Sequence, residues 1–183
     1  MTPARAIVLN ALGLYAIALV LIAAFTAQLM LHELPCPLCL LQRVLFSALA
    51  IGPILNIRFG PRPSHYALSL FVAAAGAVAS TRQVLLHIMP GDAGYGSALL
   101  GYHYYTWAFV GFAVAVVALA AMLLFDAQFK ESDKAQPVGG FVRAAVWLVL
   151  ALTALNVIST LLECGFGACP DNPVSYELLK RAP

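Results

Sequence analysis

The chain has 183 residues, of which 62% are hydrophobic and only 10% are charged. Ordinary globular domains are about 45–50% apolar and about 25% charged, so a mean hydropathy of +0.90 excludes a soluble domain and favours a membrane protein. A disordered chain would need low hydrophobicity. Nucleic-acid binding would need a clustered basic surface, whereas the net charge here is a dispersed +2.

Five apolar segments are long enough to cross a bilayer, which takes about 20 helical residues. The first is too long for the apolar core of a signal peptide, about 7–15 residues, so we expect a retained helix. The sequence predicts an all-α, polytopic membrane protein: a four-helix transmembrane bundle plus a fifth transmembrane helix, in a single membrane domain over residues 1–183. The expected spans are residues 7–31, 38–57, 66–88, 106–125 and 143–162, followed by an external tail over 163–183.

The positive charges predict the orientation of these spans, because short cytoplasmic connectors are enriched in Lys and Arg. Six positive residues lie on the side of the amino terminus: Arg5, Arg58, Arg62, Lys130, Lys134 and Arg143. The opposite connectors have none, and the tail has Lys180 and Arg181. We therefore expect a cytoplasmic amino terminus, with the first and third connectors and the tail in the opposite, external compartment, which in a bacterium is the periplasm.

The four cysteines form two pairs that this topology brings to one face. Cys36 and Cys39 lie in the first external connector, and Cys164 and Cys169 begin the external tail. The bacterial periplasm is oxidising, so paired thiols there are expected to form or handle disulfides. The first pair also opens the second span, where the positive end of the helix dipole lowers a thiol pKa and favours the reactive thiolate.

Polar residues beneath the first pair predict a binding pocket. Cys36, Cys39 and Arg43 are spaced i, i+3 and i+7, so they share one helix face. A charge at the centre of a span costs about 2.5–3.5 kcal/mol, and Arg43 therefore needs compensation. Gln42-Arg43 and Arg82-Gln83 lie at similar depths, roughly 9 Å from the helix ends at 1.5 Å per residue. We infer a lipid-facing pocket for the carbonyl oxygens of an apolar electron acceptor, such as a membrane quinone.

The run Cys36-Pro37-Leu38-Cys39-Leu40-Leu41-Gln42-Arg43 resembles the signature of the DsbB family of disulfide bond formation proteins, which are quinone-linked thiol oxidases. The segments 82–87 and 100–107 also look like this family. The resemblance implies that ubiquinone or menaquinone accepts electrons from Cys39, that Arg43 supports the quinone, and that Cys36 is the exchanging thiol. His87 matches a histidine near the family's quinone site, and it joins Gln42, Arg43 and Arg82 as expected quinone-binding residues.

The second cysteine pair departs from the family pattern. Members commonly have four spans and carry this pair between the third and the fourth, but residues 88–105 contain no cysteine here. Cys164 and Cys169 instead follow the additional fifth helix. In the expected reaction they oxidise a periplasmic thioredoxin-fold thiol oxidase, and they are restored by Cys36 and Cys39.

Other interpretations remain open from the sequence. The chain could be a membrane scaffold with structural disulfides, and a structural bridge competes especially for Cys164 and Cys169, because the neighbouring Glu163 would raise a thiol pKa. A four-cysteine zinc site is disfavoured, since structural zinc sites are normally closed modules, and no metal is expected. In the vitamin K epoxide reductase type the loop cysteines precede the CxxC, which is the reverse of the order here.

Several flanking residues also have two interpretations. Arg82 could extend to the membrane interface, and His87 could be an interfacial anchor. Four aromatic residues before the fourth span predict an interfacial belt, with quinone contact as the alternative: Tyr102, Tyr104, Tyr105 and Trp107. Asn172 and Pro173 suggest a short surface helix in the tail, as an N-cap and a first helical residue.

Overall fold

The computed structural model describes residues 1–130 and 139–180; Lys134 and Arg181, which entered the predicted orientation, lie outside the described residues. The elements in chain order are α1 (Pro3–Met30), α2 (Pro37–Leu49), α3 (Ile51–Phe59), α4 (Pro63–Leu86), β1 (Ala98–Leu99), β2 (Tyr102–His103), α5 (Tyr104–Leu123), η1 (Asp126–Phe129), α6 (Gly140–Cys164) and η2 (Glu177–Leu179).

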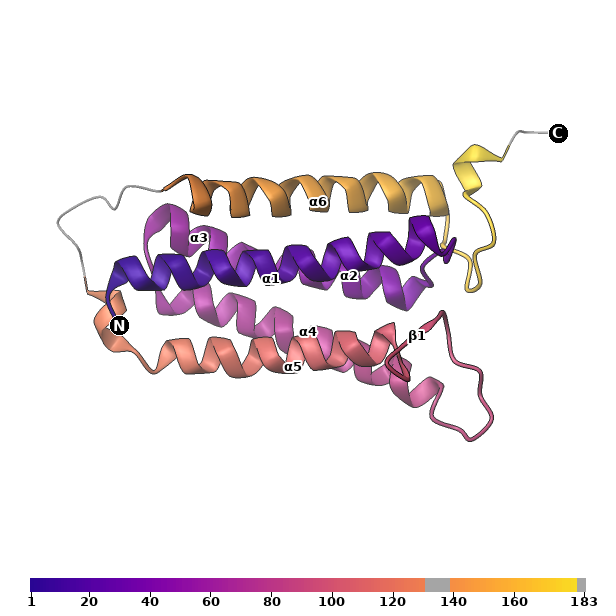
Figure 1. Cartoon of the computed structure of the whole chain (residues 1–183), viewed down its shortest axis with the longest axis horizontal. Helices are drawn as coiled ribbons and strands as arrows, with labels where there is room; N and C mark the ends of the chain where they lie inside the picture. Colours follow the sequence, from indigo (N-terminus) through magenta and orange to yellow (C-terminus); the bar gives the residue numbers. More distant parts are fainter. Residues whose placement is uncertain (131–138, 181–183) are drawn as a thin grey trace.

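The predicted all-α membrane architecture is confirmed. Five helices are long and apolar enough to cross a membrane: Pro3–Met30, Pro37–Phe59, Pro63–Leu86, Tyr104–Leu123 and Gly140–Cys164. They lie side by side along the long axis of the molecule (Figure 1), with α6 packed on α1 and α5 packed on α4. The helices α2 and α3 contact both α1 and α4, so they join the two pairs. The strands β1 and β2 form only a small antiparallel pair in the connector before α5.

Each membrane-spanning helix begins one to four residues before the span expected from hydropathy. Proline occupies the first turn of α1, α2 and α4, where its missing N–H costs nothing. Two of these helices also have a side-chain cap, from Thr2 in α1 and from Cys36 in α2. Hydropathy marks the apolar interior of a helix, whereas these caps determine where the helix begins.

The second span is divided into α2 and α3 near Pro53. Proline has no N–H, so it cannot donate to the carbonyl four residues earlier. That carbonyl belongs to Leu49, and the Ser69 hydroxyl of α4 donates to it over 2.9 Å. A Cβ at Gly52 would collide with the backbone of His65 and with Ser69, so the glycine allows α4 to approach closely enough for this bond. The break is therefore compensated by the neighbouring helix.

Small residues allow close packing between α4 and α5, where the segment 71–80 is rich in alanine. A Cβ at Gly76 would collide with the Phe112 ring of α5. Phe112 is fully buried and stacks on Phe46 of α2, with ring centroids 3.9 Å apart. This contact fixes three helices around the centre of the bundle, because interdigitated aromatic side chains bury large apolar areas.

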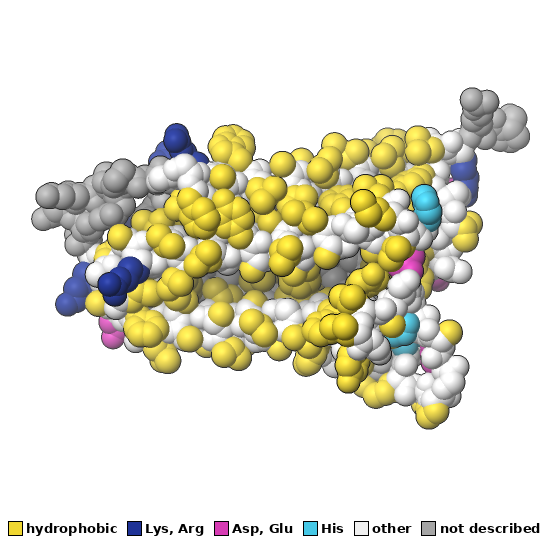
Figure 2. Space-filling view, in the orientation of Figure 1, with side chains coloured by type: hydrophobic (Ala, Val, Ile, Leu, Met, Phe, Trp, Pro, Cys, Tyr) yellow, Lys and Arg dark blue, Asp and Glu magenta, His cyan; other side chains and the backbone are white. Residues whose placement is uncertain are grey.

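The two ends of the bundle differ in chemistry. The beginning of α2 and the end of α6 lie at the same end, which we call the cysteine end (Figure 1). The amino terminus and the end of α3 lie at the other end, which we call the amino end. On the face drawn in Figure 2, most Lys and Arg side chains gather at the amino end, while the flanks between the ends are covered by hydrophobic side chains.

Candidate active site

Cys36 and Cys39 form a disulfide at the first turn of α2. Cys36 is the N-cap, and its sulfur accepts a hydrogen bond from the backbone N–H of Cys39 over 3.1 Å. Cys36 is buried, whereas Cys39 is half-buried. The helix amino terminus carries a partial positive charge that stabilises a thiolate, so this position favours the reduced, reactive form of the pair.

Gln83, held in place by Gln42, hydrogen-bonds this disulfide from below. The Gln83 amide of α4 donates to both sulfurs, over 3.3 Å to Cys36 and 3.4 Å to Cys39. Its carbonyl oxygen accepts from the Gln42 amide of α2 over 2.9 Å. Gln42 and Gln83 are both buried. The predicted meeting of the two polar pairs therefore occurs through the glutamines, and the Gln83 amide supplies a donor that would stabilise charge on either sulfur.

Arg43 lies one turn below Cys39 and is 9% exposed. Its guanidinium donates to the Gln28 side chain over 2.5 Å and to the Ala24 carbonyl over 2.9 Å, both on α1. The guanidinium also lies over the Phe25 ring, 5.4 Å from its centroid, which is within cation–π range. These contacts hold the charge at a fixed position inside the bundle.

Gln28 extends this network to α6 and the tail. Its amide donates to the Ser159 hydroxyl over 2.8 Å and to the Tyr176 hydroxyl over 3.0 Å. Tyr176 was predicted on a short surface helix, but the tail forms only the 3-10 turn η2, which starts one residue later. Residues 170–176 are irregular because the tail folds back onto the bundle, and this turns the Tyr176 hydroxyl towards Gln28. We call Arg43, Gln28, Ser159 and Tyr176 the cysteine-end network.

A cavity of about 210 Å³ opens beside Cys39. Its walls come from α1, α2, the start of α5 and the connector between α4 and α5. The residues that carry polar or aromatic groups into this lining are Glu33, Cys39, Gln42, Arg43, Phe46, Tyr95, Tyr104, Tyr105 and Trp107. One side of the cavity thus offers a sulfur and a guanidinium, and the rest offers aromatic and aliphatic surface.

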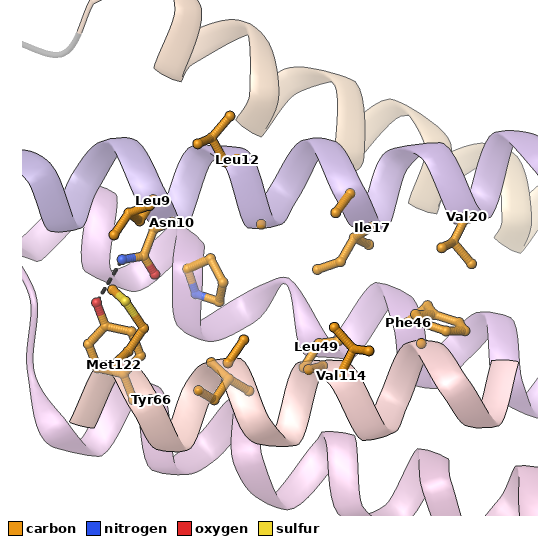
Figure 3. A pocket seen from close by; sticks show the side chains of 17 residues that line it. Leu9, Asn10, Leu12, Ile17, Val20, Phe46, Leu49, Tyr66, Val114 and Met122 are labelled. Atoms are coloured by element: carbon orange, nitrogen blue, oxygen red, sulfur yellow. Dashed lines mark hydrogen bonds between the residues drawn. The ribbon is translucent and has the colours of Figure 1, made fainter. Parts of the chain in front are cut away.

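A second, larger cavity lies next to the first, along α1 and α5. It measures about 450 Å³ and shares Val20 and Phe46 with the cavity beside Cys39. Its lining is apolar except for Asn10 and Tyr66 at the far end, which hydrogen-bond to each other over 2.8 Å (Figure 3). In Figure 2 the same face is hollowed between the two helices. An elongated apolar molecule with a polar head would fit this shape.

The connector between α4 and α5 closes one side of the cavity beside Cys39. The Tyr95 hydroxyl donates to the Leu34 carbonyl over 2.7 Å, and Ser97 donates its backbone N–H over 2.9 Å and its hydroxyl to the Glu33 carboxylate. Burial raises the pKa of Tyr95, and the charges of Glu163 and Glu33 raise it further. Glu163 therefore acts electrostatically on the wall of the cavity, although it does not line it.

Arg82 and His87 lie outside this cavity. Arg82 is exposed on the outer side of α4, among residues such as Val78 and Leu85. Consecutive residues lie about 100° apart around a helix, so when Gln83 faces α2 its neighbour Arg82 faces outwards. The His87 ring stacks on Tyr105 at 5.5 Å and its Nδ1 is 3.0 Å from Asp92. His87 thus supports an aromatic residue of the cavity from behind.

Cys164 and Cys169 form the second disulfide, at the end of α6. Cys164 is buried, and Gly165 adopts a left-handed φ of 64° that ends the helix. Phe166, inside the loop that this disulfide closes, is 91% exposed. Both cysteine pairs lie at the cysteine end, as the sequence predicted. The structure thus places an exposed loop, closed by one disulfide, at the same end of the bundle as the other disulfide.

Glu163 is the feature of this site that sequence reasoning missed. It was interpreted as a neighbour of Cys164, yet its side chain is fully buried and neither carboxylate oxygen has a hydrogen-bond partner among the described residues. Gln28 was also not predicted as a site residue, and Gln83 was expected in a polar pair of the pocket but not among the quinone-binding residues. A glutamine inside an apolar span is a signal in itself, because polar side chains are rare there and usually face the bundle interior.

Comparisons with known proteins agree with this geometry. The family model for Disulfide bond formation protein DsbB matches residues 5–95, about half of the chain. Three curated relatives named Disulfide bond formation protein B, from Xanthomonas axonopodis pv. citri, Xanthomonas oryzae pv. oryzae and Xanthomonas campestris pv. campestris, are 38%, 37% and 38% identical over 86 residues. In each case the match covers 44% of this chain and 50% of the relative.

The chain therefore spans about half the length of the curated relatives it matches. No solved structure matches it. The matched segment holds Cys36, Cys39 and Arg43, whereas α5, α6 and the second cysteine pair lie beyond it. Through the matched segment, which carries the CxxC and the arginine beneath it, the chain belongs to the DsbB family of disulfide bond formation proteins.

Proposed function

We propose that this protein is a membrane thiol:quinone oxidoreductase that supports disulfide bond formation. The observation that carries the proposal is the position of Cys39 and Arg43 on the wall of one cavity, directly beneath a helix amino terminus. Ubiquinone or menaquinone would be the electron acceptor. The protein would be in the bacterial inner membrane, with a cytoplasmic amino terminus and both cysteine pairs in the periplasm.

The residues present fit a quinone. The cavity beside Cys39 supplies a cation for a carbonyl oxygen and flat aromatic walls, and the adjoining apolar cavity suits an isoprenoid tail. Ligand pockets measure about 300–1,000 Å³, and the two neighbouring cavities, at about 210 and 450 Å³, together fall in this range. A bound quinone would accept two electrons. Arg43 and the donors around Cys39 would stabilise the negative charge that develops during their transfer.

In the proposed cycle the Cys164–Cys169 disulfide oxidises a periplasmic thioredoxin-fold partner. Each exchange is the attack of a thiolate on a disulfide sulfur through a mixed disulfide. The exposed loop around Phe166 offers the second pair to such a partner, and the first pair would then restore it. Cys39 borders the cavity and Cys36 does not, which fits Cys39 as the residue that donates to quinone and Cys36 as the exchanging thiol.

The test is quinone reduction by the purified protein supplied with a reduced thioredoxin-like partner. We expect turnover in the wild type and loss of turnover in both Cys39→Ser and Cys164→Ser. Full activity in Cys39→Ser would contradict the proposal. If Cys164→Ser kept activity and Cys39→Ser lost it, the second pair would be a structural bridge. An inactive wild type would favour a membrane scaffold with two structural disulfides.

A further inference from the structure

Arg43 and Glu163 are the two charged residues buried within the described part of the bundle. They come from different helices, α2 and α6, and the Glu163 carboxylate lies within electrostatic reach of the Arg43 guanidinium. Ser159, one turn before Glu163 on α6, is joined to Arg43 through Gln28. Helix α6, the additional fifth span, thus brings the Glu163 carboxyl group to Arg43, the arginine of the proposed quinone site.

The surroundings of Glu163 do not favour a permanent negative charge. The side chain is fully buried, both oxygens lack hydrogen-bond donors, and it lies at the carboxyl end of α6, where the helix dipole repels an anion. The titratable groups within electrostatic reach of it are Arg43 from α2 and Tyr95 from the connector before α5, and Tyr176 from the tail is within electrostatic reach of Arg43. Of these, Arg43 is the group that can balance a carboxylate.

The charge that Arg43 must balance changes during the proposed reaction. When Cys36 and Cys39 form a disulfide, the sulfurs are neutral and Arg43 needs an anion elsewhere. When the pair is reduced, Cys39 becomes a thiolate one turn above Arg43. An isolated buried charge is strongly unfavourable, so one anion near Arg43 is favoured in each state, and two anions would repel each other.

We propose that Glu163 is this alternating anion: ionised while Cys36 and Cys39 are oxidised, and protonated while Cys39 is a thiolate. The inference rests on the proposed function, and Glu163 acts through Arg43. Reduction of the disulfide by the second pair breaks the S36–S39 bond and leaves a thiol on Cys36, a thiolate on Cys39 and a proton on Glu163. Reoxidation forms the bond again, passes two electrons to quinone and releases these two protons, which are the two that quinone needs to become hydroquinone.

The proposal predicts how the potential of the Cys36–Cys39 pair depends on pH in protein without quinone. In the wild type two protons accompany two electrons, so the equilibrium constant for reduction changes about a hundredfold per pH unit, or about 59 mV. In Glu163→Gln only the Cys36 proton accompanies the two electrons, so the equilibrium constant for reduction changes about tenfold, or about 30 mV, per pH unit. Glu163→Asp should retain the wild-type slope, and so should Glu177→Gln, which alters an exposed carboxylate paired with Lys180.

The measurement is equilibration with dithiol buffers, followed by alkylation and mass spectrometry of peptides that contain Cys36 and Cys39. It applies at pH values where reduced Cys39 is a thiolate and Cys36 keeps its proton. Equal slopes in the wild type and Glu163→Gln overturn the proposal. A wild type that reduces no quinone overturns the proposed function instead, so the two failures are distinguishable.

Infrared difference spectra give a second measurement that does not depend on the Glu163→Gln variant folding. Reduction of the wild type should produce the band of a protonated carboxyl group, and Glu177→Gln should keep it. Cys39→Ser should lose the band although its Cys164–Cys169 pair is still reduced. Absence of the band in the wild type, or its persistence in Cys39→Ser or Glu163→Gln, overturns the proposal.

Discussion

Two networks of buried polar side chains cross α1, one near each end of the bundle, and they differ in charge. The amino-end network is a single chain of donors and acceptors through Asn56, Asn10, Tyr66 and Gln128 to the Met122 carbonyl. All of its side chains are neutral, and none has an unpartnered buried atom among the described residues. The cysteine-end network holds the Arg43 guanidinium and adjoins the unpartnered carboxylate of Glu163.

The difference separates polar residues that hold helices together from those that do chemistry. A neutral, fully bonded chain stabilises α1, α3, α4 and η1 against each other, and no charge changes there in any proposed step. The cysteine-end network lies beside a disulfide and a cavity, and the adjoining Glu163 carboxylate has no hydrogen-bond partner among the described residues. Because a buried, partly satisfied polar group is costly, retaining one at a redox site indicates a functional role.

The largest effect should come from breaking the cysteine-end network at Arg43. In Arg43→Met, Cys39 and the developing charge on quinone lose their buried cation, so turnover should fall about a hundredfold, as when one oxyanion donor is removed. The matched control is Arg82→Met, which removes an exposed arginine at similar depth and should keep turnover within about twofold of the wild type. Quinone reduction in detergent measures both variants.

A comparable loss in Arg82→Met would contradict the separation of these two arginines and would restore the sequence-based prediction that both bind quinone. Full turnover in Arg43→Met would contradict the cavity beside Cys39 as the quinone site. Binding of quinone by each variant should be measured in parallel, because an effect on KM alone would indicate positioning without charge stabilisation.

A smaller effect of a different kind should follow from breaking the amino-end network. Asn56 is fully buried, and its carbonyl accepts from the Arg62 N–H and lies 2.9 Å from His65 Nδ1. Asn56→Leu leaves these groups without a partner, which should lower the free energy of unfolding by about 1–3 kcal/mol. Thermal unfolding in detergent measures it, and turnover per folded molecule should stay within about twofold.

The control for this variant is Asn156→Leu, another buried asparagine. Its amide bonds only to the Leu152 carbonyl of its own helix among the described residues, so its removal should destabilise the protein less. If Asn56→Leu instead left stability unchanged but reduced turnover strongly, the amino-end network would belong to the reaction and the contrast between the two networks would fail.

Much of this architecture could be predicted from the sequence because it depends on local composition. Apolar runs predicted the five helices, and the CxxC with Arg43 seven residues after its first cysteine predicted a shared helix face. The meeting of Gln42 with Gln83 followed from matched depth. Depth in the membrane could not predict how α4 is rotated about its own axis. Arg82 and Gln83 are neighbours in sequence, and the packing of α4 on α2 decides which of them faces inwards.

The roles of Gln28, Tyr176 and Glu163 depend on how the fifth helix and the tail pack, which no local pattern encodes. Glu163 follows an apolar run, and a charged residue at that place is normally expected in the interfacial region. It is buried in the structure, where α6 packs against α1, α2 and η2. For the same reason the tail was predicted as a surface helix, although the Tyr176 hydroxyl reaches Gln28 inside the bundle.

The smallest expected effect on turnover comes from a substitution in the tail, which tests whether the tail supports the quinone site. Tyr176→Phe removes one of the two hydroxyls that accept from Gln28, while Ser159 remains. A single hydrogen bond contributes about 0.5–1.5 kcal/mol, so kcat/KM for quinone should fall about threefold. Tyr102→Phe, which removes an exposed hydroxyl outside the cavity lining, should have no effect. Equal values in both variants would mean that Gln28 holds Arg43 without the tail, and the cysteine-end network would then end at α6.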